Sequence, residues 1–248
     1  MPTGGFLCDS TFCEGESMTR IVIPLLTLAL TAAMLFVLCS GCGSDRGLGY
    51  DVSSNKMKQI GLAIACYKQT HESFPPAVME KDGKPLLSWR VAILPFMDED
   101  ALYKQFHLDE PWDSPHNLKL AETVPFLFQS SDSPKDGKTR IMVFTGKGAA
   151  FDGGKRLHED EIRDGMTYTI LCVQAGPDKA VPWTKPEDLP FDPENPLAAL
   201  GNVPSEGFLA VFFDGHVMRL KVDSKMLKAL ITPDGGETID ETKFQGGQ

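Results

Sequence analysis

The spacing of apolar residues predicts an amphipathic helix from Ser53 to about His71. Its apolar positions recur every three or four residues: Met57, Ile60, Ile64 and Tyr67. Ser53 or Ser54 can cap the first turn, and Phe74-Pro75-Pro76 stops the helix. Gly61, Ala63 and Ala65 thin one side of the helix, so we expect this side to lie flat against a sheet.

Three later runs are rich in β-branched and aromatic residues and are bounded by Gly, Asp or Pro, as strands usually are: residues 141–145, 167–173 and 208–213. Asp214-Gly215 separates the last run from residues 217–220, which predicts a two-residue hairpin with a type I′ turn. Asp223 or Ser224 is expected to cap a short helix that ends near Ile231.

Together these elements predict an α+β domain over residues 53–232, in which the N-terminal helix packs on an antiparallel β-sheet. Proline is frequent in residues 182–204, so we expect long Pro-rich loops, and a loop of this length is often functional. Residues 43–52 are expected to form a tether and residues 233–248 a polar C-terminal tail.

An uncharged segment, residues 21–44, precedes this domain and is long enough for export or membrane anchoring. Residues 1–17 carry acidic side chains and no Lys or Arg, which is the opposite of the basic start of a signal peptide. Met18-Thr19-Arg20 fits that start better. We therefore predict that translation begins at Met18 and that residues 1–17 are a non-structural extension.

The apolar segment ends in Leu38-Cys39-Ser40-Gly41-Cys42, and small residues before a cysteine resemble a bacterial lipobox. This pattern predicts that residues 18–42 are a signal and anchor segment, with lipidation at Cys42. Cys39 stands where a lipobox usually has Leu, so an uncleaved helical anchor and ordinary signal-peptidase cleavage are the alternatives. A lipid or an N-terminal helix would make the membrane a partner. The domain would then lie in the cell envelope, facing the periplasm or the exterior.

Composition excludes two classes of protein. The 248 residues are 42% hydrophobic, and a net charge of −10 would repel a phosphate backbone, so we expect no nucleic-acid partner. Because only one uncharged stretch is long enough to cross a bilayer, the chain is not a polytopic membrane protein. Cys66 and Cys172 lie in apolar segments, where they either pair or act as small hydrophobic residues.

A series of strings runs along most of the chain, and several of them are rich in Trp, Pro and Asn: residues 53–63, 74–77, 87–91, 94–95, 102–106, 110–117, 162–165, 169–171, 181–189 and 213–217. They resemble a large uncharacterised pilin-like family that is expanded in planctomycete bacteria. The resemblance implies a pilin-like fold and a prepilin-type N-terminal helix with a Glu near its start. Residues 21–37 contain no acidic residue, and a lipobox-like end replaces the prepilin site, which counts against incorporation into a filament. A second departure is Pro204, which stands where many relatives carry a His.

The strongest metal-like cluster gathers five potential ligands within ten residues: His107, Asp109, Glu110, Asp113 and His116. Their spacing matches neither a zinc-binding helix nor an EF-hand loop. Asp113-Ser114-Pro115 is typical of a helix start, which gives the cluster a structural role. We therefore expect no metal, no cofactor and no catalytic residue.

Three tryptophans are candidate binding residues: Trp89, Trp112 and Trp183. Exposed together, they would form a platform for a glycan or a protein partner. The alternative is that they fill the core of a loop-rich fold, because burial of a large aromatic ring is favourable.

These observations predict a non-enzymatic, envelope-anchored surface or periplasmic protein with a structural or interaction role. Its expected partners are the membrane and either an envelope protein or a glycan. The second hypothesis is an exported glycan- or peptide-binding module that uses the Trp-bearing loops. A metal-dependent hydrolase is the third.

Overall fold

The structure is a computed structural model that describes residues 46–130, 136–237 and 239. The predictions for the leader, including the start at Met18 and the lipidation of Cys42, lie outside the described residues. Within the described ranges, every helix is too short or too polar to cross a membrane.

Helix α2, Arg46–His71, is the longest helix of the described domain. It begins seven residues before Ser53, so the helix takes up most of the expected tether. The added turns include Gly47 and Gly49, which disfavour helix, so no local signal in the sequence marks this early start. The expected apolar positions are all buried: Met57, Ile60, Ile64 and Tyr67.

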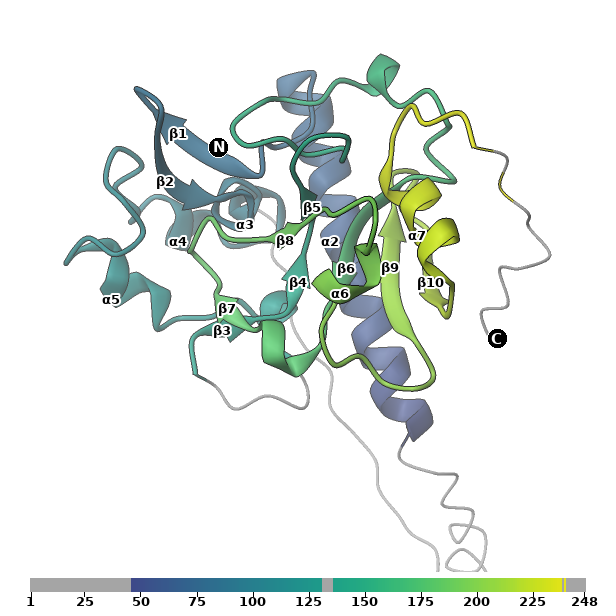
Figure 1. Cartoon of the computed structure of the whole chain (residues 1–248). Helices are drawn as coiled ribbons and strands as arrows, with labels where there is room; N and C mark the ends of the chain where they lie inside the picture. Colours follow the sequence, from purple (N-terminus) through teal and green to yellow (C-terminus); the bar gives the residue numbers. More distant parts are fainter. Residues whose placement is uncertain (1–45, 131–135, 238, 240–248) are drawn as a thin grey trace, which may run out of the picture. The chain divides into compact units, whose positions relative to one another are not determined.

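Four antiparallel strands form the main sheet in the order β10-β9-β6-β4. Their bounds are β4 Ile141–Met142, β6 Ile170–Gln174, β9 Phe208–Phe212 and β10 Val217–Leu220. Helix α2 lies across β9 and β10 (Figure 1). The fold is therefore α+β, as the sequence predicts.

Helix α2 approaches the sheet closely at Gly61. Ala63 is buried as well, whereas Ala65, expected on the same side, is exposed. A Cβ atom at Gly61 would lie 2.9 Å from Cγ1 of Val211 on β9 and 3.7 Å from the Cα atom of Gly215. The absence of a side chain thus allows the helix to rest directly on the strand, and the expectation of a helix lying flat on a sheet is confirmed.

The predicted type I′ turn between β9 and β10 is wrong. Phe212 N–H donates to the His216 carbonyl at 3.0 Å, and Gly215 N–H donates to the Phe212 carbonyl at 2.9 Å. These bonds close a three-residue loop in which Gly215 has φ +89° but Asp214 lacks the positive φ that a type I′ turn requires. This matches a type I turn followed by a glycine bulge, and the Asp214 carboxylate accepts the His216 N–H at 3.1 Å.

Shorter elements complete the domain. After α2, the elements in chain order are β1 Val78–Lys81, β2 Lys84–Ser88, α3 Trp89–Ala92, η1 Leu94–Phe96, α4 Asp100–Tyr103, α5 Asn117–Ala121 and η2 Phe126–Phe128. Four short strands and two 3₁₀ helices, labelled η, follow: β3 Lys138–Thr139, β5 Phe144–Thr145, η3 Glu159–Glu161, η4 Pro177–Lys179, β7 Val181–Pro182 and β8 Leu189–Pro190. Helices α6 Pro196–Ala199 and α7 Ser224–Ile231 follow, and Asp223 caps α7 by accepting the Met226 N–H at 2.8 Å.

The Pro-rich segment is tied to the sheet region rather than forming a free loop. β3 pairs antiparallel with β7, and β5 pairs parallel with β8. Leu189 N–H donates to the Val143 carbonyl at 3.0 Å, and Phe191 N–H donates to the Thr145 carbonyl at 2.8 Å. Proline removes donors from this segment, so the remaining amides make the connections.

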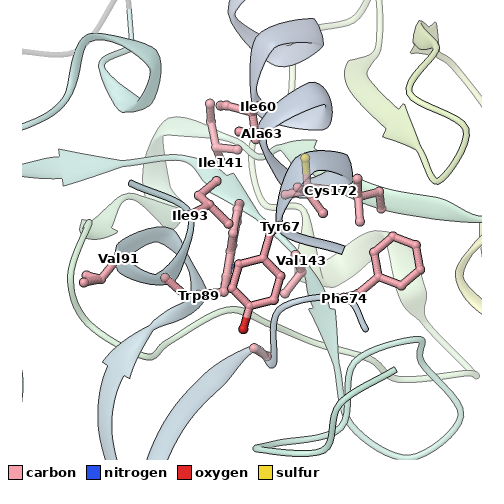
Figure 2. Close-up of a cluster of buried hydrophobic side chains, with 14 of the residues drawn as sticks. Ile60, Ala63, Tyr67, Phe74, Trp89, Val91, Ile93, Ile141, Val143 and Cys172 are labelled. Atoms are coloured by element: carbon pink, nitrogen blue, oxygen red, sulfur yellow. The ribbon is translucent and has the colours of Figure 1, made fainter. Parts of the chain in front are cut away.

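Both faces of β9 are buried. Leu209 and Val211, together with Phe213 directly after the strand, belong to the core cluster that contains the buried face of α2. Phe208, Ala210 and Phe212 belong to a second cluster, which includes residues of α6 and α7. A strand covered on both faces explains the continuous apolar run in the sequence. Figure 2 shows the first cluster, with Tyr67 directing its hydroxyl away from Ile60 and Ala63.

Candidate functional site

A pocket of about 480 Å³ lies at the C-terminal end of α2. We call it the aromatic pocket and define it by seven of its lining residues: Tyr67, His71, Met79, Glu80, Phe96, Tyr103 and Arg156. They come from α2, β1, η1, α4 and the loop before η3. A pocket of this size and mixed lining suits a small ligand.

Two side chains one helical turn apart form the wall contributed by α2. The rings of Tyr67 and His71 stack with centroids 4.0 Å apart, because residues i and i+4 share a helix face. His71 Nδ1 donates to the Tyr67 carbonyl at 3.0 Å, which leaves Nε2 as the second polar atom of the ring. Phe96 packs edge-on against both rings, with its ring centroid 5.8 Å from that of Tyr67 and 6.0 Å from that of His71.

The two tyrosines keep their hydroxyl protons. Burial raises the pKa of Tyr67, Arg156 opposes this rise, and Tyr103 adds to it. Burial also raises the pKa of Tyr103. Both hydroxyl groups can therefore donate and accept hydrogen bonds at neutral pH.

Two opposite charges also line the pocket. Glu80, on β1, is exposed, and its carboxylate lies so close to Gly154 that a Cβ atom there would be 2.6 Å from Oε2. Arg156, two residues further on, is also exposed. Within the described part of the chain, neither side chain forms an ion pair with the other or with a third residue.

A buried ion pair joins Arg90 on α3 to Asp188 in the Pro-rich segment. Arg90 Nη2 lies 2.6 Å from Asp188 Oδ1, and their side chains are 0% and 2% exposed. Arg90 also donates to the Ile141 carbonyl at 2.9 Å and to Ser88 Oγ at 2.7 Å. The same Asp188 oxygen accepts the Val143 N–H at 2.9 Å. The pair thus fastens α3, the strand region around Val143 and the Pro-rich segment together.

Burial dominates the titration of this pair. Loss of water raises the pKa of Asp188 to about 6, although Arg90 and the hydrogen bonds from Val143 and Trp89 act in the opposite direction. Burial also lowers the pKa of Arg90, and Asp188 opposes that change. Asp188 Oδ2 is buried without a hydrogen-bond partner in the described structure. Because the pair connects three segments of the chain, we assign it a structural role.

The hypothesis of an exposed tryptophan platform is wrong for Trp89 and Trp183. Their side chains are buried in the first core cluster, where Trp89 Nε1 donates to Asp188 at 3.3 Å and Trp183 Nε1 donates to the Ala121 carbonyl at 3.0 Å. Burial of the ring with a satisfied N–H is the favourable arrangement for Trp. Trp112 is half-buried, with the Lys185 ammonium 5.7 Å from its ring centroid.

The metal-like cluster is partly assembled. The rings of His107 and His116 stack at 3.6 Å, and His107 Nδ1 lies 3.0 Å from a Glu110 carboxylate oxygen. The described residues contain no group of three or more ligands placed to hold a metal ion. The buried Asn117 organises this loop, because its amide donates to the His107, Glu110 and Pro111 carbonyls.

The two cysteines of the described domain are free. Cys172 is fully buried, and burial raises the pKa of its thiol, so it packs as a small hydrophobic residue. Cys66 is half-buried on α2.

The fold and the pocket define an α+β domain with a preformed aromatic site. A family model described as "Protein of unknown function (DUF1559)" matches residues 52–154, less than half of the chain. This supports a relation to a domain family of unknown function. Searches of the curated proteins and of the solved structures found no match.

Proposed function

We propose that the protein is a non-enzymatic interaction protein of the cell envelope, with a pilin-like domain held at a membrane. The anchor is a lipid on Cys42 or, alternatively, an uncleaved N-terminal helix. The main support is the uncharged segment of residues 21–44, which ends in Ser-Gly-Cys-Gly-Ser, one residue short of the start of the folded domain at Arg46.

The packing of α2 supports the pilin-like part of the proposal. A long helix lying across an antiparallel sheet is the arrangement that the resemblance to pilin-like proteins implies. Residues 21–37 lack the carboxylate that pilin-type polymerisation uses. We therefore propose a domain that acts singly and does not assemble into a filament.

The position of the aromatic pocket supports an interaction role. Tyr67 and His71 lie in the last turns of α2, whereas the anchor segment joins the helix at Arg46. A helix of 26 residues is about 39 Å long, so the pocket lies far along the domain from its point of attachment. An exported module for a peptide or glycan ligand remains the second candidate, with this pocket in place of the tryptophan platform.

Fatty-acid labelling tests the anchor. Cells that make the full chain are labelled with a palmitate analogue, and the wild type is compared with Cys42→Ser and with the matched control Cys39→Ser. We expect Cys42→Ser to lose the label and accumulate a slower-migrating precursor, while Cys39→Ser is labelled and membrane-bound like the wild type. Undiminished labelling of Cys42→Ser contradicts the lipid anchor.

Shearing of the cells tests whether the domain acts singly. Recovery of the chain in sheared filaments that retain residues 21–37 contradicts the single-domain role.

A further inference from the structure

Glu80 and Arg156 bring opposite charges to the aromatic pocket without neutralising each other. The Glu80 carboxylate lies beside Gly154, and β1 is bonded to the same loop because the Val78 N–H donates to the Gly153 carbonyl at 3.3 Å. Arg156 lies close enough to Tyr67 to act on its hydroxyl electrostatically. The pocket therefore offers one anionic and one cationic position.

The walls between these positions are aromatic and apolar. Tyr67, Phe96 and Tyr103 present rings, and Met79 adds a polarisable thioether. The edge-on contact of Phe96 with Tyr67 and His71 fixes the orientation of the rings before any ligand is present. A preformed wall of this kind lowers the ordering cost of binding a flat apolar group.

We propose that the aromatic pocket binds a small zwitterion with an aromatic side chain, whose carboxylate faces Arg156 and whose ammonium group faces Glu80. This inference rests on the proposed role of the domain as an interaction protein and names the ligand class of its pocket. Free amino acids and the termini of short peptides share this chemistry.

The two charges decide between ligand classes. An uncharged apolar ligand would remove water from both charged groups without replacing it, which is unfavourable. A simple anion would use Arg156 but would be repelled by Glu80. A zwitterion satisfies both groups at once, and the guanidinium group can hold a carboxylate with two hydrogen bonds.

Titration calorimetry on the purified protein tests the ligand class. The probes are L-phenylalanine, the dipeptide glycyl-L-phenylalanine, N-acetyl-L-phenylalanine and L-phenylalaninamide. We expect either or both of the first two to bind, and the acetylated and amidated probes to bind at least about tenfold more weakly because each lacks one charge. Tighter binding of L-phenylalanine identifies a free amino acid as the natural source, and tighter binding of the dipeptide identifies a peptide.

Two variants assign each charge to its residue. Glu80→Gln should weaken the zwitterion about tenfold and abolish its advantage over the acetylated probe. Arg156→Gln should have the same effect on the advantage over the amide. Glu194→Gln and Arg163→Gln, both at exposed positions outside the pocket, are matched controls and should bind like the wild type.

Three results overturn the inference: no binding of either zwitterion at millimolar concentration, equal binding of all four probes, or equal losses in the pocket variants and their controls. Thermal midpoints within a degree or two of the wild type establish that the variants are folded. Calorimetry does not depend on Cys42, and fatty-acid labelling does not depend on the pocket. The proposed anchor and the proposed ligand can therefore fail separately.

Discussion

Replacing Gly61 by Val should destabilise the domain by disturbing the packing of α2 on the sheet. A Cβ atom at this position would already lie 2.9 Å from Cγ1 of Val211, and Val adds two methyl groups beyond it. Val211 is fully buried and stiff at χ1, so it cannot move aside easily. Overpacking of a close-packed core costs about 1 to 3 kcal/mol, and we expect a loss near the upper end.

Helix propensity predicts the opposite sign, which makes the test decisive. In an exposed helix, Gly to Val should be stabilising by a few tenths of a kcal/mol. Ala65 lies on the exposed side of the same helix, so Ala65→Val is a control for the β-branched side chain and should cost only about 0.6 kcal/mol.

Urea unfolding, followed by circular dichroism, measures both variants. Combining Gly61→Ala with Val211→Ala should give a favourable coupling of about 1 kcal/mol, because the shorter strand residue makes room for the new methyl group. If Gly61→Val is as stable as the wild type, the helix does not approach β9 as closely as described, and the reasoning is refuted.

Two further predictions concern titration and backbone conformation. Asp188 binds its proton more tightly in the folded protein, where its pKa is about 6, than in the unfolded chain, so its stabilising contribution is present below about pH 4 and is lost as the pH rises through 6. Relative to Asp188→Asn, the free energy of unfolding of the wild type should therefore fall by up to about 3 kcal/mol between pH 4 and 7. A difference between the two proteins that does not change with pH contradicts this prediction. Gly215 has φ +89°, and a Cβ atom there would meet no neighbour, so Gly215→Val should lower the free energy of unfolding by about 1 to 3 kcal/mol through backbone strain alone. Asn tolerates this conformation, so Gly215→Asn should lose clearly less. Equal thermal midpoints for the two variants would reject backbone strain as the cause.

The parts of the fold that could be predicted depend on local patterns. The apolar spacing from Met57 to Tyr67 identifies the buried face of α2, and the run from Phe208 to Phe213 identifies β9. The first signal arises because a helix buries residues at a fixed period, and the second because β9 is buried on both faces. The start of α2 at Arg46 carries no such signal, and the sequence therefore misplaces it.

The hairpin shows where a local pattern is insufficient. Asp-Gly is common in type I′ turns and in type I turns with a glycine bulge, and the strand register decides between them. Val217 pairs with Val211, and the hydrogen bond from Phe212 to His216 then leaves three residues, 213–215, in the loop. Register is set by which side chains the two cores bury, and this information is spread over the whole sheet.

Contacts between distant residues could not be predicted. Arg90 and Asp188 are 98 positions apart, and each is typical of the surface when considered alone. A buried charge becomes stable only with its partner, so its burial cannot be inferred from its own segment. The same holds for the aromatic pocket: the sequence predicts that Tyr67 faces the core, but β1, η1 and α4 create the cavity beside it.

The segment that matches the family model forms most of the pocket but cannot complete the core. Residues 52–154 contain every residue that lines the pocket except Arg156. The buried face of α2, however, rests on β9, which lies beyond the segment. Arg90, inside the segment, pairs with Asp188, which also lies beyond it. A helix without its sheet exposes its apolar face, and an unpaired buried arginine is strongly destabilising. The matched segment therefore supplies the aromatic walls and Glu80, while the remainder of the chain holds them in place and adds the cationic position.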